Sequence, residues 1–185
     1  SQGNTILNYG GAPGATNPAT GIFANNQWGL NVSGNTINNN DGGGVNHVST
    51  LRGIFLSTSL SASATCNFNN ITIKSGATTS QVAGIENSFG STPAGNTINI
   101  RNNTLAIEYL TATSGALYGI YNTASPATLN IRNNNITGIN YSAASLAGSG
   151  AVYPIYTTSS SATMTVNILG NIVSNVARVG TSGGT

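Results

Sequence analysis

The stretch that decides the fold is residues 119–136, which read GIYNTASPATLNIRNNNI. It opens on a Gly-Ile step, continues with an apolar-Asn-apolar triplet, and ends on an Asn-rich corner followed by an aliphatic residue. Its apolar segments are short and alternate with polar residues, without the three-to-four-residue spacing of a helix. The stretch therefore predicts short strands separated by tight corners.

The same pattern recurs along the whole chain. The Gly-Ile step returns at intervals of 32, 31, 35 and 35 residues, with Pro in place of Gly at the last step. We expect one domain, residues 1–185, of about five coils of 31–35 residues that start near residues 21, 53, 84, 119 and 154, after a partial coil at 1–20. The isoleucines of the step are Ile22, Ile54, Ile85, Ile120 and Ile155.

A repeat of this length favours a parallel β-solenoid. A propeller blade takes about 40–45 residues and four strands, whereas each repeat here has about three short strands. In an all-β solenoid, equivalent strands of successive coils stack about 4.7–4.9 Å apart. We expect the step isoleucines to form one core stack. The triplets predict a second stack, Leu30, Cys66, Ile98, Leu129 and Val166, and a third, Val32, Phe68, Ile100, Ile131 and Ile168.

The middle residue of every triplet is asparagine. Stacked asparagines can hydrogen-bond amide to amide along the solenoid axis, and the triplet leaves open whether this ladder faces inward or outward. The corners that follow are rich in Gly and Asn, which tolerate the left-handed backbone of a tight turn. The predicted structural ladder consists of Asn31, Asn67, Asn99, Asn130 and Asn167.

The composition narrows the function. Asn, Thr, Gly and Ser together make up 97 of the 185 residues, against 5 Lys or Arg and 3 Asp or Glu. The scattered cations form no nucleic-acid surface, and no apolar run approaches the roughly 20 residues of a membrane-spanning helix. The single Cys66 can form neither an intramolecular disulfide nor a cysteine-based metal site. We expect no nucleic-acid partner and no insertion into a membrane.

The acidic residues do not predict catalysis. Cleavage of a glycosidic bond needs paired carboxylates, or a base beside a cation. The three acids, Asp41, Glu86 and Glu108, fall at different positions of the coil. His47 has no second His or nearby Cys with which to bind a metal, and we expect it to be a solvated loop residue. The sequence predicts no catalytic residue, no metal site and no cofactor.

Two outward-facing rows could contact a ligand. Arg101 and Arg132 occupy the same position in adjacent coils, which predicts two solvated arginines or, as the alternative, a contact for an anion or a uronic acid. The second row is aromatic: it could stack on sugar rings or another rod, or its rings could stack on one another. Its members are Phe23, Phe55, Tyr121 and Tyr156, with Glu86 interrupting the row and Tyr118 and Tyr153 nearby.

The coil at residues 119–136 resembles the right-handed parallel β-helix repeats of the pectin-lyase-like superfamily. Its Ser-, Thr- and Ala-rich style is most similar to large secreted surface proteins of Bacteroidota. This resemblance implies a right-handed coil and a secreted, extracellular or cell-surface location. It implies no single activity, because the superfamily includes lyases, hydrolases, adhesins and passive stalks.

The ends of the chain suggest how the solenoid is used. Neither end carries a capping helix or gatekeeper charges, which predicts either a longer solenoid or copies that stack edge to edge. We therefore expect a non-catalytic structural protein that forms an extracellular fibre or a cell-surface stalk by end-to-end stacking. Its expected partners are other copies or the rest of a longer solenoid, with polysaccharide as a further partner. The alternatives are a carbohydrate-binding adhesin and a relative of polysaccharide lyases or hydrolases.

Overall fold

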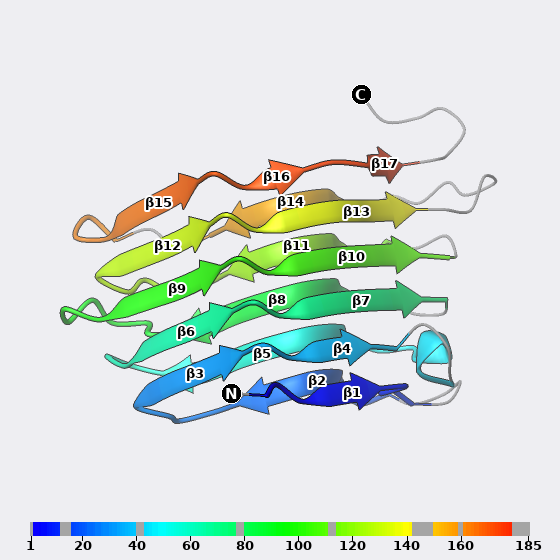
Figure 1. The fold of residues 1–185 in the computed structure, drawn as a ribbon, viewed down its shortest axis with the longest axis horizontal. Helices are drawn as coiled ribbons and strands as arrows, with labels where there is room; N and C mark the ends of the chain where they lie inside the picture. The colour runs from blue at the N-terminus through cyan, green and yellow to red at the C-terminus, as the bar shows by residue number, and fades with distance from the viewer. Residues whose placement is uncertain are drawn as a thin grey trace.

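The computed structural model describes residues 2–11, 16–39, 43–76, 80–110, 114–141, 150–158 and 161–178. Within them the chain is a parallel β-solenoid of three sheets, with a single 3-10 turn, η1 (Gly43–Asn46). In Figure 1 the chain rises from its N-terminus, with the front strands running to the right and the rear strands to the left, so the coil is right-handed. The predicted fold class is confirmed.

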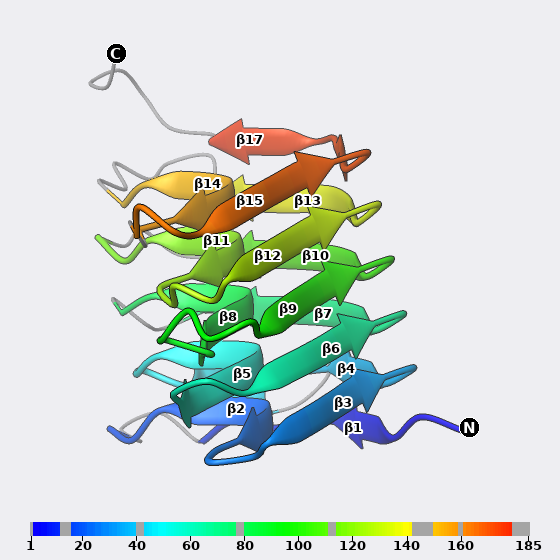
Figure 2. The same cartoon turned by 90° about the vertical axis from the view of Figure 1, so that its left-hand side faces the viewer.

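Each full coil contributes one strand to each sheet, except that the last coil contributes both β16 and β17 to the third, and every pairing between coils is parallel (Figure 2). The first sheet contains β2 (Ala19–Ala24), β5 (Leu51–Ser59), β8 (Val82–Phe89), β11 (Leu117–Asn122) and β14 (Val152–Thr157). The second contains β3 (Gly29–Ser33), β6 (Ser63–Asn67), β9 (Thr97–Arg101), β12 (Thr128–Arg132) and β15 (Thr165–Leu169). The third contains β1 (Thr5–Leu7), β4 (Thr36–Asn38), β7 (Asn70–Ser75), β10 (Thr104–Tyr109), β13 (Asn135–Tyr141), β16 (Ile172–Val173) and β17 (Val176–Arg178).

The Gly-Ile step lies in the first sheet and turns two consecutive residues into the core. The five step isoleucines pair in register from β2 to β14, and in β8 both Gly84 and Ile85 are buried. A Cβ atom on Gly84 would lie 2.4 Å from Cδ2 of Leu105 and 2.7 Å from the carbonyl oxygen of Gly119. Glycine recurs here because the first and third sheets approach too closely for a side chain.

Substitution of this glycine tests the close approach of the sheets. Gly84→Ala should lower the free energy of unfolding by about 2 kcal/mol or more, since overpacking a rigid core typically costs about 1–3 kcal/mol. Gly29→Ala is the matched control, because nothing lies within 4 Å of a Cβ atom at that strand position. Urea unfolding of both variants measures the difference, and equal stability would contradict the close approach.

The second sheet corrects the predicted register of one coil. Cys66 pairs with Val32 and Ile100. The predicted partners of Cys66, Leu30 and Ile98, pair with Ala64 instead. The triplet of this coil is therefore residues 64–66, two residues before the predicted one. A shift of two residues keeps the alternation of inward and outward side chains, so hydrophobic periodicity alone does not distinguish the two registers.

Phe68 is consequently a corner residue and belongs to no core stack. Its φ of 55° is left-handed, and its side chain is 65% exposed. The equivalent corners in other coils hold Gly34, Asn102, Asn133 or Gly170, also at positive φ. Glycine and asparagine adopt this conformation readily, whereas a bulky side chain is strained in it.

Candidate functional site

A ladder of asparagines runs through the solenoid where the second sheet turns into the third. In each of its first five members Nδ2 donates to Oδ1 of the asparagine one coil further along, at 2.8 or 2.9 Å, and the backbone N–H donates to the same Oδ1 at 2.9 or 3.0 Å. The other Nδ2 hydrogen binds a backbone carbonyl of the preceding coil, as from Asn103 to Cys66 at 2.9 Å. We call this set the inner ladder: Asn4, Asn35, Asn69, Asn103, Asn134 and Asn171.

The triplet asparagines form a second, outward-facing ladder. Asn130 donates to Asn99 at 2.9 Å, and Asn167 donates to Asn130 at 3.0 Å. These side chains are half-buried and lie between two inward residues of the same strand. The predicted member Asn67 is wrong, because Thr65 is the residue in register with Asn31 and Asn99.

From the sequence, the Asn-rich corners predict only turn formation for the inner ladder residues. One signal could have identified them: each inner ladder asparagine after Asn4 follows the last apolar residue of its triplet by three positions. Counting back from Asn69 gives Cys66, which is the correct register of the second coil. The burial of Asn35, Asn69, Asn103 and Asn134, with Asn103 fully inaccessible, became visible only in the structure.

The two ladders should contribute unequally to the free energy of unfolding. Asn103→Ala removes the Oδ1 that accepts hydrogen bonds from Asn69. It also removes the Nδ2 that donates to Oδ1 of Asn134 and to the carbonyl oxygen of Cys66. Each buried polar group without a partner costs about 1–3 kcal/mol, so we expect a loss of about 3 kcal/mol or more. Asn130→Ala, in the half-exposed ladder, should cost below about 1.5 kcal/mol. Chemical unfolding measures both, and an equal loss would contradict the assignment.

The described carboxylates are each engaged by a cation. Glu86 in β8 forms an ion pair with Arg52 and accepts a hydrogen bond from Gln81 at 2.6 Å. Glu108 in β10 lies 3.4 Å from the Nζ of Lys74. The two acids lie on different sheets, so they do not converge on one site. Asp41 lies outside the described residues.

The aromatic row is in register, as its spacing predicted, but most of its rings contact one another. Tyr118 and Tyr121 stack at 4.4 Å between ring centroids, and Tyr153 and Tyr156 at 4.5 Å. Contacts at 5.5 and 5.7 Å join these pairs across the coils. Tyr118 faces outward beside Tyr121 because the Gly-Ile step between them points inward, and the stacked rings cover part of each other's faces.

The other end of the row has a different environment. Phe23 and Phe55 lie 5.6 Å apart with their planes at 47°, and Phe23 is 58% exposed. The guanidinium of Arg52 lies 4.4 Å from the centroid of Phe55. Phe55 therefore contacts a cation, and Phe23 keeps the more open ring.

His47 is buried, which corrects the expectation of a solvated residue. Its Nδ1 accepts a hydrogen bond from the Gly11 N–H at 3.1 Å, and its buried Nε2 has no partner among the described residues. Burial lowers the pKa of the imidazole below its ordinary value, against smaller opposing effects of the Thr50 and Asn17 backbone. The folded chain therefore favours neutral His47.

This burial makes stability depend on pH. Because the folded-state pKa is below the unfolded value of about 6.5, the unfolded chain binds the proton more readily. The free energy of unfolding should fall as pH drops from about 7.5 to about 5.5. In His47→Gln the slope over this window should be flatter, and an unchanged slope in thermal unfolding would contradict the assignment.

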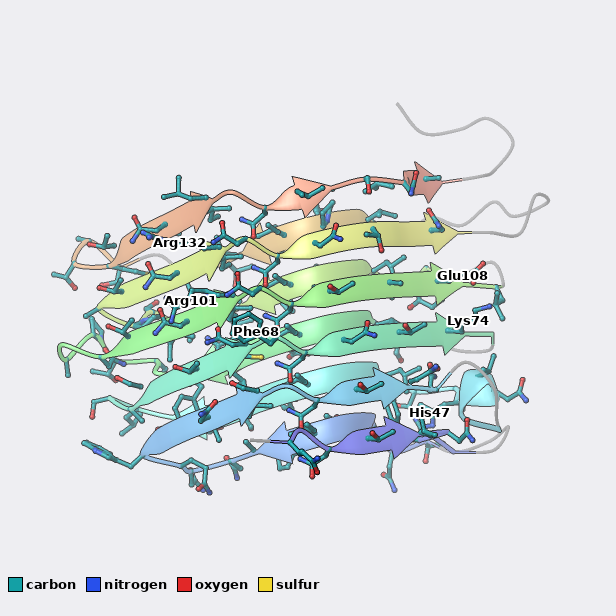
Figure 3. The ribbon with its side chains drawn as sticks, in the orientation of Figure 1. His47, Phe68, Lys74, Arg101, Glu108 and Arg132 are labelled. Carbon is teal, nitrogen blue, oxygen red and sulfur yellow. The ribbon has the colours of Figure 1, made fainter. Side chains whose placement is uncertain are left out.

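Arg101 and Arg132 face each other across β9 and β12. Their Cα atoms are register partners, between Asn67 on one side and Leu169 on the other. Figure 3 shows both arginines at the ends of their strands, with Phe68 near the end of β6. Within the described part of the chain, the Nε atoms of both arginines and Oδ1 of Asn67 are buried without a hydrogen-bond partner. This row contains two like charges and three unsatisfied polar atoms.

Other chemistry-bearing groups are limited. Cys66 is buried, and desolvation raises the pKa of its thiol to about 12, so no reactive thiolate forms near neutral pH. In the ranges that the structure describes, no group of three or more His, Cys, Asp or Glu could hold a metal ion. The same ranges contain no helix long and apolar enough to cross a membrane.

Comparison with known proteins finds no match: no family model, no curated protein and no solved structure matches this chain. The fold and its ladders nevertheless define the class, which is a parallel β-solenoid. The resemblance to pectin-lyase-like repeats and to Bacteroidota surface proteins stays a prediction.

Proposed function

We propose that this chain is a non-catalytic structural β-solenoid that serves as part of an extracellular fibre or cell-surface stalk. The observation that carries the proposal is the solvent exposure of the core-facing side chains in the last described coil. Its core-facing residues are aliphatic and exposed, although the same positions one coil earlier are fully buried. A further coil packed on this surface would bury them as the other coils bury theirs.

The comparison is direct because the strands are in register. Val166 and Ile168 in β15 are 42% and 44% exposed, whereas their partners Leu129 and Ile131 are inaccessible. Val173 and Val176 show the same contrast with the buried Ile136 and Ile139 of β13. Each apolar Å² removed from water contributes about 25 cal/mol, so stacking of another coil is favourable.

The inner ladder has a direction that also suits continued stacking. Each coil donates from its backbone N–H and Nδ2 to the Oδ1 of the next coil. Asn171, the last described member, keeps its N–H and one Nδ2 hydrogen without a described acceptor, while Oδ1 of Asn4 has no described donor. One end of the ladder thus offers donors and the other an acceptor, which favours head-to-tail addition.

The next coil would come either from a second copy of this chain or from further coils of a longer solenoid. The third sheet extends one level beyond the other two, because β1 precedes β2 and pairs with β4. A copy that docks β1 on β16 would continue the third sheet but leave β14 and β15 without a neighbouring strand. A full further coil would cover all three strands, so we favour the stalk over the simple fibre.

Two observations support the non-catalytic part of the proposal. The described acids are separated and ion-paired, whereas acid-base catalysis of polysaccharide cleavage uses adjacent groups. The extracellular location rests on the resemblance noted above and on a scaffold of paired backbone and amide groups, which suits a protease-rich environment.

Charge on the exposed end should block association. In the wild-type chain we expect concentration-dependent self-association, because the end coil presents unpaired strands and aliphatic side chains. Ile168→Lys should suppress it by placing a cation among these residues. Thr92→Lys, in an exposed loop between β8 and β9, is the charge-matched control. Sedimentation velocity and electron microscopy of all three chains measure the effect.

Two outcomes would contradict the proposal. One is a wild-type chain that stays monomeric at every concentration and binds no hydrophobic dye. The other is association that Thr92→Lys suppresses as strongly as Ile168→Lys, since the end coil would then not be the contact.

A further inference from the structure

The arginine row, defined as Arg101, Arg132 and the neighbouring Asn67, is not explained by a structural role. Like charges directly opposite on neighbouring strands repel each other, and the strands that carry these two lie about 4.8 Å apart. Two other described cations are neutralised, since Arg52 pairs with Glu86 and Lys74 with Glu108. No carboxylate of the described residues neutralises the arginine row.

We propose that Arg101 and Arg132 together bind a tetrahedral dianion: free sulfate, inorganic phosphate or a phosphate monoester. Two formal positive charges on neighbouring strands match one doubly charged group. The planar guanidinium donates hydrogen bonds in a fork whose geometry fits two oxygens of such a group. Binding would reduce the repulsion between the arginines and supply acceptors for their two unpaired Nε–H groups.

Phe68 supports the assignment independently of the charges. Its backbone N–H donates to the carbonyl oxygen of Arg101 at 3.3 Å, which fixes the corner beside the arginine row. The ring is 65% exposed at a left-handed corner. Strained and exposed residues of this kind gather at ligand contacts. Phe68 places an apolar surface next to the anion, where the carrier of a phosphate monoester would lie.

The isolation of the pair argues against other anionic partners. Nucleic-acid binding generally uses many phosphate contacts, whereas the other described cations with known partners, Arg52 and Lys74, lie on other sheets and are ion-paired. A single carboxylate carries one charge and would neutralise only half of the pair. The geometry therefore selects one compact dianion over an extended polyanion.

The test is titration of the chain with sodium sulfate or sodium phosphate, against sodium chloride at equal ionic strength. NMR observation of the arginine Nε–H groups gives a local readout. We expect saturable shifts of Arg101 and Arg132 that Lys74→Gln leaves unchanged. Arg132→Gln should weaken the binding seen at Arg101 by about tenfold or more, because charge-assisted hydrogen bonds are lost.

Thermal unfolding provides a second measurement. Sulfate stabilises proteins in general by exclusion from their surface, so the relevant quantity is the shift in wild type beyond the shift in Arg132→Gln. We expect an additional rise in Tm for wild type and for Lys74→Gln, and none for Arg101→Gln. Glucose 6-phosphate, compared with inorganic phosphate and with glucose, distinguishes a phosphate monoester on a carrier from the free ion.

Three results would overturn the proposal. The first is an equal sulfate response in wild type and Arg132→Gln. The second is the absence of saturable shifts at both arginines. The third is tighter binding of oligogalacturonate or a single-stranded oligonucleotide than of inorganic phosphate and glucose 6-phosphate, because the class of anion would then be wrong.

Discussion

Axial hydrogen bonding between neighbouring coils is the interaction on which the rest of this structure depends. Each strand pairs in parallel with the strand one coil away, and the inner ladder adds side-chain amides to the same direction of bonding. An amide has two donors and a carbonyl with two lone pairs, and a buried asparagine such as Asn103 uses all four. A slip in register would leave these groups buried without partners, so the ladder selects one alignment of the coils.

The thinness of the solenoid follows from the same stacking. Glycine in the first sheet lets the third sheet approach, and the isoleucine beside it fills the remaining core. Because both residues point inward, the residues on either side point outward and meet. The stacked tyrosines Tyr118 and Tyr121 are thus a consequence of core geometry. Their position needs no ligand to explain it.

The scarcity of charge makes each charged residue informative. In an ordinary domain a surface ion pair contributes little and many charges are merely solvated. Here Arg52 and Lys74 have acidic partners on the neighbouring coil, which shows that the fold places opposite charges together where it has both. Arg101 and Arg132 depart from this pattern, and this departure is the reason that we propose an anion site on the side face of the solenoid.

The sequence by itself determined the architecture, because the repeat of the Gly-Ile step, triplet and corner is visible in residues 119–136 and fixes strand order, coil length and the isoleucine stack. It also placed Arg101 beside Arg132. Only the tertiary structure decided the register of the second coil, the burial of His47 and the difference between the two ladders. Alternation has a period of two residues, so it does not distinguish Cys66 from Ala64. Burial depends on neighbours distant in sequence. It distinguishes the inner ladder residues Asn103 and Asn134 from the corner residues Asn102 and Asn133 that precede them.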